Sequence, residues 1–131
     1  SGMEIPIQAL QKLGVKFTHI FSSENDPLVK KTIQANFQPM TLYDDITRRN
    51  HAKAPYVDLY VSGFPCQPFS TMGKQQGFED KSGKGTICRD VLSYIENQRP
   101  KTFILENVKG LVTLKNGKYS RKILKALHSI K

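Results

Sequence analysis

The heptapeptide VDLYVSG, residues 57–63, is the clearest β-strand pattern in the sequence. Its apolar run is typical of a buried strand, and it ends at a glycine. From Gly63 to Gly85 the chain holds five glycines and two prolines and shows no periodic pattern. A stretch of that length without secondary structure is uncommon inside a compact domain and is typical of a functional loop. We therefore expect a strand that runs directly into a loop with a chemical role.

Helical and strand-like patterns alternate on both sides of this strand. Gly14 is suited to end a first helix, and Asp26 followed by Pro27 predicts the cap and first turn of a second. Such alternation predicts a parallel α/β sheet with right-handed crossovers. The predicted elements are a helix over 3–13, strands over 15–23, 40–46 and 101–107, a helix with Val29, Ile33 and Phe37, a helix with Ile87, Val91 and Ile95, and a final helix with Ile123, Leu124, Leu127 and Ile130.

The composition indicates one globular domain, with 131 residues of which 38% are hydrophobic. The sequence has no apolar run of 18 residues and no leader-like start, so we expect an intracellular protein without a membrane partner, cytoplasmic if bacterial and nuclear if eukaryotic. Cys66 and Cys88 are then expected as free thiols, and no histidine lies at zinc-ligand spacing from either.

The net charge of +9 favours a polyanionic partner such as nucleic acid. Between Lys115 and Lys131 there are six basic residues and no acid. Taken alone, this run is explained first by a solvated helix face, so the charge supports a nucleic-acid partner without identifying it.

Polar residues follow each predicted strand, at the sheet edge where open α/β folds bind ligands. Glu24 lies 22 positions after Gly2, near the offset of an acid that binds ribose hydroxyls. A surface carboxylate or helix cap remains the alternative for Glu24, and more so for Asp45. Cys66 stands between Pro65 and Pro68, in SGFPCQPFS (62–70). Such rigidity suits a nucleophile, but a core thiol fits the pattern equally well.

The same residues carry a family resemblance. GFPCQPFS, followed by ILENVKGL, resembles the Pro-Cys-Gln and Glu-Asn-Val motifs of the C5-cytosine DNA methyltransferases. The segments SSEND, DDIT, GKQQGFED and GTI also match, in the family's order and over nearly the whole chain. The resemblance implies a Rossmann-like fold, S-adenosylmethionine as methyl donor and a flipped cytosine of DNA as acceptor.

The resemblance also implies roles for individual residues. Cys66 would add to carbon 6 of cytosine, and Glu106 would hydrogen-bond ring N3 and the exocyclic amine. Such a donor must be protonated during part of the cycle, which burial favours. By the same resemblance, Pro65 and Gln67 would shape the cysteine loop, and Ser70 would lie near the target phosphate. Glu24 would bind the cofactor ribose, and Asp45 would bind its adenine amine. The residues that would line the cofactor pocket or its surroundings are Gly2, Met3, Asn25, Ile46, Ile87 and Val108. Each of these residues also has a structural alternative. Asn107 would cap the next turn, and core positions would explain Ile46, Ile87 and Val108.

The match departs from the family in two ways. Glu4 and Ile5 stand where the first motif has two glycines, and Lys84 replaces an arginine. The first strand, the eighth to tenth motifs and the target-recognition domain have no counterpart. We therefore expect residues 1–131 to be a partial catalytic domain with unpaired sheet edges, weakly active or inactive unless a second chain supplies the rest. Methylation of tRNA, or nucleic-acid binding without catalysis, are the alternative functions.

Overall fold

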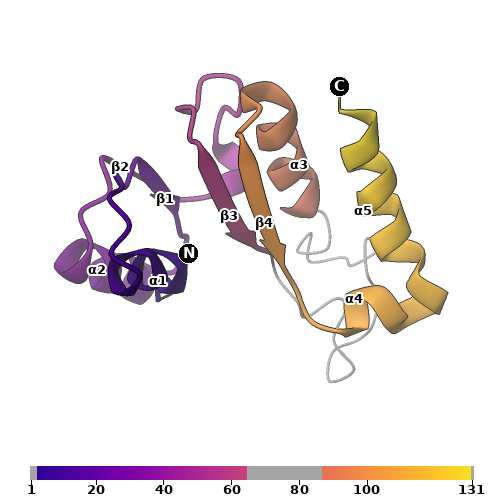
Figure 1. Ribbon diagram of the computed structural model, residues 1–131, viewed down its shortest axis with the longest axis horizontal. Helices are drawn as coiled ribbons and strands as arrows, with labels where there is room; N and C mark the ends of the chain where they lie inside the picture. Colours follow the sequence, from indigo (N-terminus) through magenta and orange to yellow (C-terminus); the bar gives the residue numbers. More distant parts are fainter. Residues whose placement is uncertain (1–2, 65–86, 131) are drawn as a thin grey trace.

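The computed structural model describes residues 3–64 and 87–130, except for the side chains of Leu114 and Lys115. Figure 1 shows helices and parallel strand pairs that follow one another along the chain, which confirms the α/β class. The elements are α1 (Ile5–Lys12), β1 (Phe21–Ser23), α2 (Pro27–Asn36), β2 (Thr41–Tyr43), the 3-10 helix η1 (Ile46–Arg48), β3 (Leu59–Gly63), α3 (Ile87–Gln98), β4 (Thr102–Glu106), α4 (Gly110–Thr113), the 3-10 helix η4 (Leu114–Gly117) and α5 (Lys118–Ser129).

Local sequence signals set the ends of the first two helices. Gly14 has a left-handed backbone with φ of 67°, and its N–H donates to the carbonyl of Gln11 just after α1. Asp26 Oδ1 accepts hydrogen bonds from the backbone N–H groups of Leu28 and Val29 at 2.8 and 3.1 Å, so Asp26 is the predicted cap of α2. Both predictions are confirmed.

The strands form two separate parallel pairs rather than the single sheet that the alternation predicted. In the described part of the chain, β1 pairs only with β2, and β3 pairs only with β4. Side chains meet between the pairs instead, where the Phe21 ring lies 6.3 Å from the Tyr60 ring. Among the described residues, β1 and β3 therefore each have one edge without a strand partner, as expected.

A buried core joins α3 to the β3–β4 pair and to β1. Tyr94 of α3 is fully buried, and its ring lies 4.3 Å from Tyr60 of β3 and 5.4 Å from Phe21 of β1. The Tyr94 hydroxyl donates to the carbonyl of Pro55 at 2.6 Å, and desolvation raises its pKa to about 12. A second cluster consists of Phe64, Cys88, Tyr119 and Ile123. These contacts hold the carboxyl end of β3 against α3 and α5.

The final helix differs from its prediction in one apolar residue. Tyr119 and Ile123 of α5 are buried, but Leu124 is 53% exposed. Leu124 instead lines an open apolar groove with Phe103 of β4 and Val112 of α4. The helical periodicity had placed Leu124 on the buried face, since residues 123 and 124 differ by only about 100° around a helix. Among the described residues, no helix has the length and apolarity needed to cross a membrane.

Glu4 combines backbone strain with a buried charge. Its φ of 51° and ψ of 39° are left-handed, a conformation that disfavours residues with a Cβ atom. The residue is only 5% exposed, and Oε1 has no hydrogen-bond partner in the part of the chain that the structure describes. The backbone here therefore suits a glycine better than a glutamate.

Replacement of Glu4 by glycine is expected to raise the free energy of unfolding by about 1 kcal/mol, because it relieves the left-handed strain and removes a buried oxygen, Oε1, that has no hydrogen-bond partner among the described residues. Thermal unfolding measures the change. Glu4→Ala is the matched control, since it removes the carboxylate and retains the strain. A glycine variant that melts no higher than the alanine variant would contradict the backbone argument.

Candidate functional site

Glu24 and Asp45 follow neighbouring parallel strands and therefore lie at one edge of the β1–β2 pair. The Glu24 N–H donates to the carbonyl of Tyr43 at 3.0 Å, which extends the pairing up to Glu24. Glu24 Oε1 accepts from the N–H of Asp26 at 3.0 Å. Two carboxylates at adjacent strand ends are an arrangement that can receive hydroxyl and amine donors of one ligand.

Asp45 is also the cap of η1. Its Oδ1 accepts from the backbone N–H of Thr47 at 2.9 Å and from the Thr47 hydroxyl at 2.8 Å. These bonds, the backbone one foremost, lower the pKa of Asp45 below its ordinary value. The capping alternative raised for Asp45 is confirmed, and the carboxylate is charged at neutral pH.

The second strand pair brings Glu106 to the start of the cysteine loop. Gly63 pairs with Glu106 as the last residues of β3 and β4. A Cβ atom built on Gly63 would lie 3.1 Å from Glu106 Oε2, so the carboxylate lies directly over this glycine. A Cβ atom at this position would require the carboxylate to move by a few tenths of an ångström.

Asn107 connects the same two chain segments. Its Nδ2 donates to the carbonyl of Phe64 at 3.1 Å, and its Oδ1 accepts from the N–H of Val108 at 2.9 Å. The second bond joins Asn107 to its immediate neighbour, so it is not the contact of a turn cap, which would reach a residue two or three positions further on. Because the Phe64 side chain is buried, Asn107 fixes the backbone two residues before Cys66 to a packed part of the protein.

Glu106 itself is exposed in the described structure. The burial expected for a protonated donor is therefore not supplied by residues 3–64 and 87–130. The residues from the sequence analysis that lie outside the described part of the chain are Gly2, Pro65, Cys66, Gln67, Ser70 and Lys84. Their predicted roles stay predictions.

Cys88 contrasts with the pattern around Cys66. It is a free thiol buried in the second core cluster, as expected for a cysteine without a disulfide partner. Desolvation raises its pKa to about 11, so it is protonated at neutral pH. Cys88 is therefore a structural thiol and a poor nucleophile.

The other predicted cofactor and substrate residues differ in burial. Met3 and Asn25 are exposed. Ile46 packs against the cluster around Tyr94, and Ile87 and Val108 pack against the cluster around Cys88. The core interpretation of these three residues agrees with their packing.

Sequence reasoning missed Gly63 and the Arg49 network. Gly63 had a usable signal, since a glycine at a strand end directly before a reactive loop indicates a close approach. Arg49 lies in the polar stretch TRRNH (47–51), which reads as an exposed loop, yet its side chain is only 6% exposed. No local pattern marks it as buried.

Comparison with protein families decides the classification. The family model described as C-5 cytosine-specific DNA methylase matches residues 1–131. The chain belongs to this family. Among curated members, the type II methyltransferase M.HpaII of Haemophilus parainfluenzae is 46% identical over 121 residues, which are 91% of this chain and 32% of that protein.

Two further members of the family show the same pattern of coverage. M.BsuFI of Bacillus subtilis is 43% identical over 85% of this chain and 26% of its own length. M.DsaV of Dactylococcopsis salina is 40% identical over 98% of this chain and 34% of its own length. The chain thus spans about a quarter to a third of the curated relatives that it matches.

Proposed function

We propose that this chain is the part of a C5-cytosine DNA methyltransferase that carries the nucleophilic cysteine, the cytosine-binding glutamate and the adenosine end of the cofactor pocket. The observation that supports this most is the pairing of Gly63 with Glu106, joined by the hydrogen bond from Asn107 to Phe64. Cys66 follows Phe64 by two residues, and two residues span at most about 7 Å. This short spacing supports the proposal that the two catalytic groups act on one cytosine.

The cofactor of this proposal is S-adenosylmethionine. Glu24 and Asp45 suit its adenosine, because the ribose hydroxyls and adenine amine are donors and the two carboxylates are acceptors at adjacent strand ends. The left-handed backbone at Glu4 fits the glycine turn of the family's first motif. When bound, the cofactor would supply an electrophilic methyl group.

Catalysis in this proposal begins with Cys66. Its thiolate forms a bond from Sγ to carbon 6 of cytosine, which makes carbon 5 electron-rich and able to accept a methyl group. Glu106 hydrogen-bonds ring N3 and the exocyclic amine, so negative charge that develops on the ring is neutralised. After methylation, a base such as a water molecule takes the carbon 5 proton, the electrons of that C–H bond form the double bond between carbons 5 and 6, and the bond from Sγ to carbon 6 breaks to release the thiolate. The flipped base itself would cover Glu106 and supply the burial that the described residues do not.

We also propose that residues 1–131 are part of a Rossmann-like catalytic domain without a target-recognition domain. Further residues of the same protein or a second chain would complete the sheet between β1 and β3. The two parallel pairs with facing unpaired edges support this proposal.

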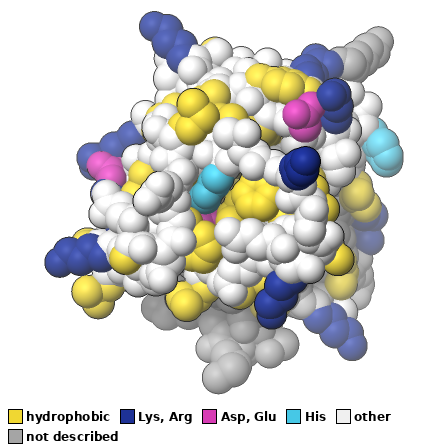
Figure 2. Space-filling view, turned by 60° about the vertical axis from the view of Figure 1, so that its left-hand side comes forward, with side chains coloured by type: hydrophobic (Ala, Val, Ile, Leu, Met, Phe, Trp, Pro, Cys, Tyr) yellow, Lys and Arg dark blue, Asp and Glu magenta, His cyan; other side chains and the backbone are white. Residues whose placement is uncertain are grey.

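DNA is the proposed substrate, and tRNA is the alternative within the same chemistry. The basic charge suits either polyanion, and Figure 2 shows Lys and Arg side chains around the margin of one face with few acidic ones between them. The exposed basic residues of α5 are Lys118, Arg121, Lys122 and Lys125, spaced along the helix opposite its buried residues.

Transfer of labelled methyl groups tests this function. We expect the full-length protein to methylate cytosine in duplex DNA, and residues 1–131 alone to be much less active. Preferential methylation of tRNA would support the alternative substrate. Binding of either nucleic acid without methylation would replace the enzyme proposal by a binding module.

Gly63→Ala is expected to lower kcat about tenfold and to change the KM for the cofactor little. A catalytic group misplaced by about 1 Å can lower the rate about 100-fold, and the added Cβ atom requires a smaller shift of Glu106 than that. Steady-state kinetics on the full-length protein measures this. Ser62→Ala, one residue earlier and on the other face of β3, is the control. Equal kcat values for the glycine and alanine forms would show that the close approach does not matter.

A further inference from the structure

Arg49 has a buried guanidinium group that is surrounded by aromatic rings. The residue is only 6% exposed. Its Cζ atom lies 5.0 Å from the Tyr94 ring centroid, 5.1 Å from that of Phe21 and 5.7 Å from that of Tyr43. These rings come from α3, β1 and β2, so one cation contacts three elements. Cation–π attraction is strongest in such desolvated settings.

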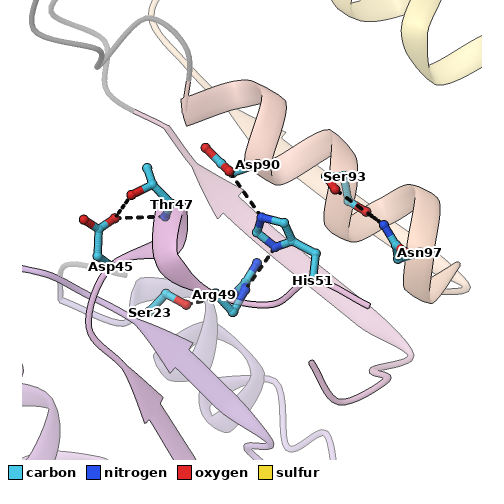
Figure 3. A network of polar contacts seen from close by, with 8 residues as sticks. All are labelled: Ser23, Asp45, Thr47, Arg49, His51, Asp90, Ser93 and Asn97. Atoms are coloured by element: carbon cyan, nitrogen blue, oxygen red, sulfur yellow. Dashed lines mark hydrogen bonds and ion pairs between the residues drawn. The ribbon is translucent and has the colours of Figure 1, made fainter. Parts of the chain in front are cut away.

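The hydrogen bonds of Arg49 are directional. Figure 3 shows its guanidinium between Ser23 and His51, with His51 in turn bonded to Asp90. Arg49 Nη1 donates to the Ser23 hydroxyl at 2.8 Å, and Nε donates to His51 Nδ1 at 3.4 Å. Nη2 is buried and has no hydrogen-bond partner within residues 3–64 and 87–130.

His51 connects Arg49 to Asp90. Its Nδ1 accepts from Arg49 Nε at 3.4 Å, and its Nε2 lies 3.2 Å from Asp90 Oδ1. Within residues 3–64 and 87–130 the guanidinium forms no direct ion pair, and Asp90 is connected to it through His51. A buried cation in such a setting is costly, and a hydrophobic side chain would fill the space at lower cost.

The position of Arg49 relates it to both carboxylates of the proposed adenosine site. Arg49 is the C-cap residue directly after η1, and Asp45 is the N-cap residue directly before it. The Arg49 partner Ser23 is the last residue of β1, directly before Glu24. One side chain therefore connects the end of β1, next to Glu24, to the 3-10 helix that Asp45 caps.

We propose that Arg49 is a positioning residue for the cofactor: it holds the end of β1 against η1 so that Glu24 and Asp45 face the same adenosine. This inference rests on the proposed function, since it assigns the two carboxylates to S-adenosylmethionine. It differs from a purely structural role, in which loss of Arg49 lowers stability and affects all kinetic constants through unfolding.

Arg49→Met in the full-length protein tests the inference. We expect the KM for S-adenosylmethionine and the Kd for S-adenosylhomocysteine to rise about tenfold, which corresponds to one charge-assisted hydrogen bond. At saturating cofactor, kcat and the KM for DNA should stay within about twofold, since Arg49 contacts neither reacting group. Binding is measured by calorimetry below the melting temperature of each variant.

Gln98→Met is the matched control. Gln98 Nε2 donates to the carbonyls of His51 and Ala52 at 2.8 and 3.0 Å, so this variant loosens the same loop without removing the guanidinium. We expect a lower melting temperature and unchanged cofactor binding. Equal losses of cofactor affinity in Gln98→Met and Arg49→Met would assign the effect to loop stability and overturn the proposal.

A double-mutant cycle tests the connection to Glu24. If Arg49 acts by placing Glu24, then Arg49→Met should weaken cofactor binding much less in a Glu24→Gln background. If the two substitutions instead raise the Kd by independent factors that multiply in the double variant, the proposal is overturned.

Ser23→Ala is the alternative test if Arg49→Met does not fold. It removes the hydroxyl that accepts from Arg49 Nη1 and leaves the aromatic contacts of the guanidinium in place. We expect the Kd for S-adenosylhomocysteine to rise about threefold. No rise would contradict it.

The cycle also separates the two levels of inference. A wild-type protein that does not bind S-adenosylhomocysteine would overturn the proposed function itself. A wild-type protein that binds it, with Arg49→Met binding equally well, would overturn only the role of Arg49.

Discussion

Glu106→Gln in the full-length protein should lower kcat by about 10²- to 10⁴-fold, the range attributed to positioned acid–base groups. The amide keeps the size of the side chain and can still form a hydrogen bond, but it cannot give a proton to ring N3. Steady-state methyl transfer at saturating DNA and cofactor measures the loss. Glu106 is exposed at the end of β4, so the substitution should leave the melting temperature nearly unchanged.

Glu96→Gln on the exposed surface of α3 is the control for Glu106→Gln, since it makes the same chemical change away from the strand ends. We expect its activity to equal that of the wild type. A positioned catalytic acid is expected to contribute at least about 100-fold to kcat. If Glu106→Gln kept more than about a third of wild-type kcat, the loss would be far smaller than that, and the proposed role of Glu106 would be wrong.

Cys66→Ala should abolish methyl transfer, with a loss of about 10⁴-fold or more, as seen when a covalent nucleophile is removed. Without the thiolate, carbon 5 of cytosine stays too electron-poor to accept a methyl group. DNA binding and cofactor binding should persist, and gel shift and calorimetry check both.

Cys88→Ala provides the matched control for Cys66→Ala. Cys88 is buried in the core and is protonated at neutral pH, so its removal should lower the melting temperature and preserve kcat. A variant pair with the opposite outcome, in which Cys88→Ala is inactive and Cys66→Ala is active, would contradict the assignment of the nucleophile.

Most elements of the fold could be predicted because each has a local cause. The Asp26 cap, the Gly14 terminus and the strand at residues 57–63 are all set by neighbouring residues. Sheet pairing is not local. The sequence predicted one sheet from the alternation of elements, whereas in the described residues β1 and β3 meet through side chains and not through backbone pairing.

The candidate site was predicted only in part for the same physical reason. Glu24, Asp45, Glu106 and Asn107 lie at strand ends, and strand ends can be read from periodicity. Arg49 could not be found in this way, because its burial results from rings on three separate elements that meet only in the fold. The side chain of Leu124 was misplaced because helical periodicity does not show which neighbours cover a helix.

Covalent trapping tests the central claim most directly. DNA with 5-fluorocytosine at the target site should form a stable adduct with the full-length protein in the presence of S-adenosylmethionine, because fluorine at carbon 5 cannot leave as a proton does. Mass spectrometry should locate the adduct on the tryptic peptide 54–74, which contains Cys66, and Cys66→Ala should give none. Methylation of ordinary DNA with no trapped adduct, or an adduct on Cys88, would contradict the account.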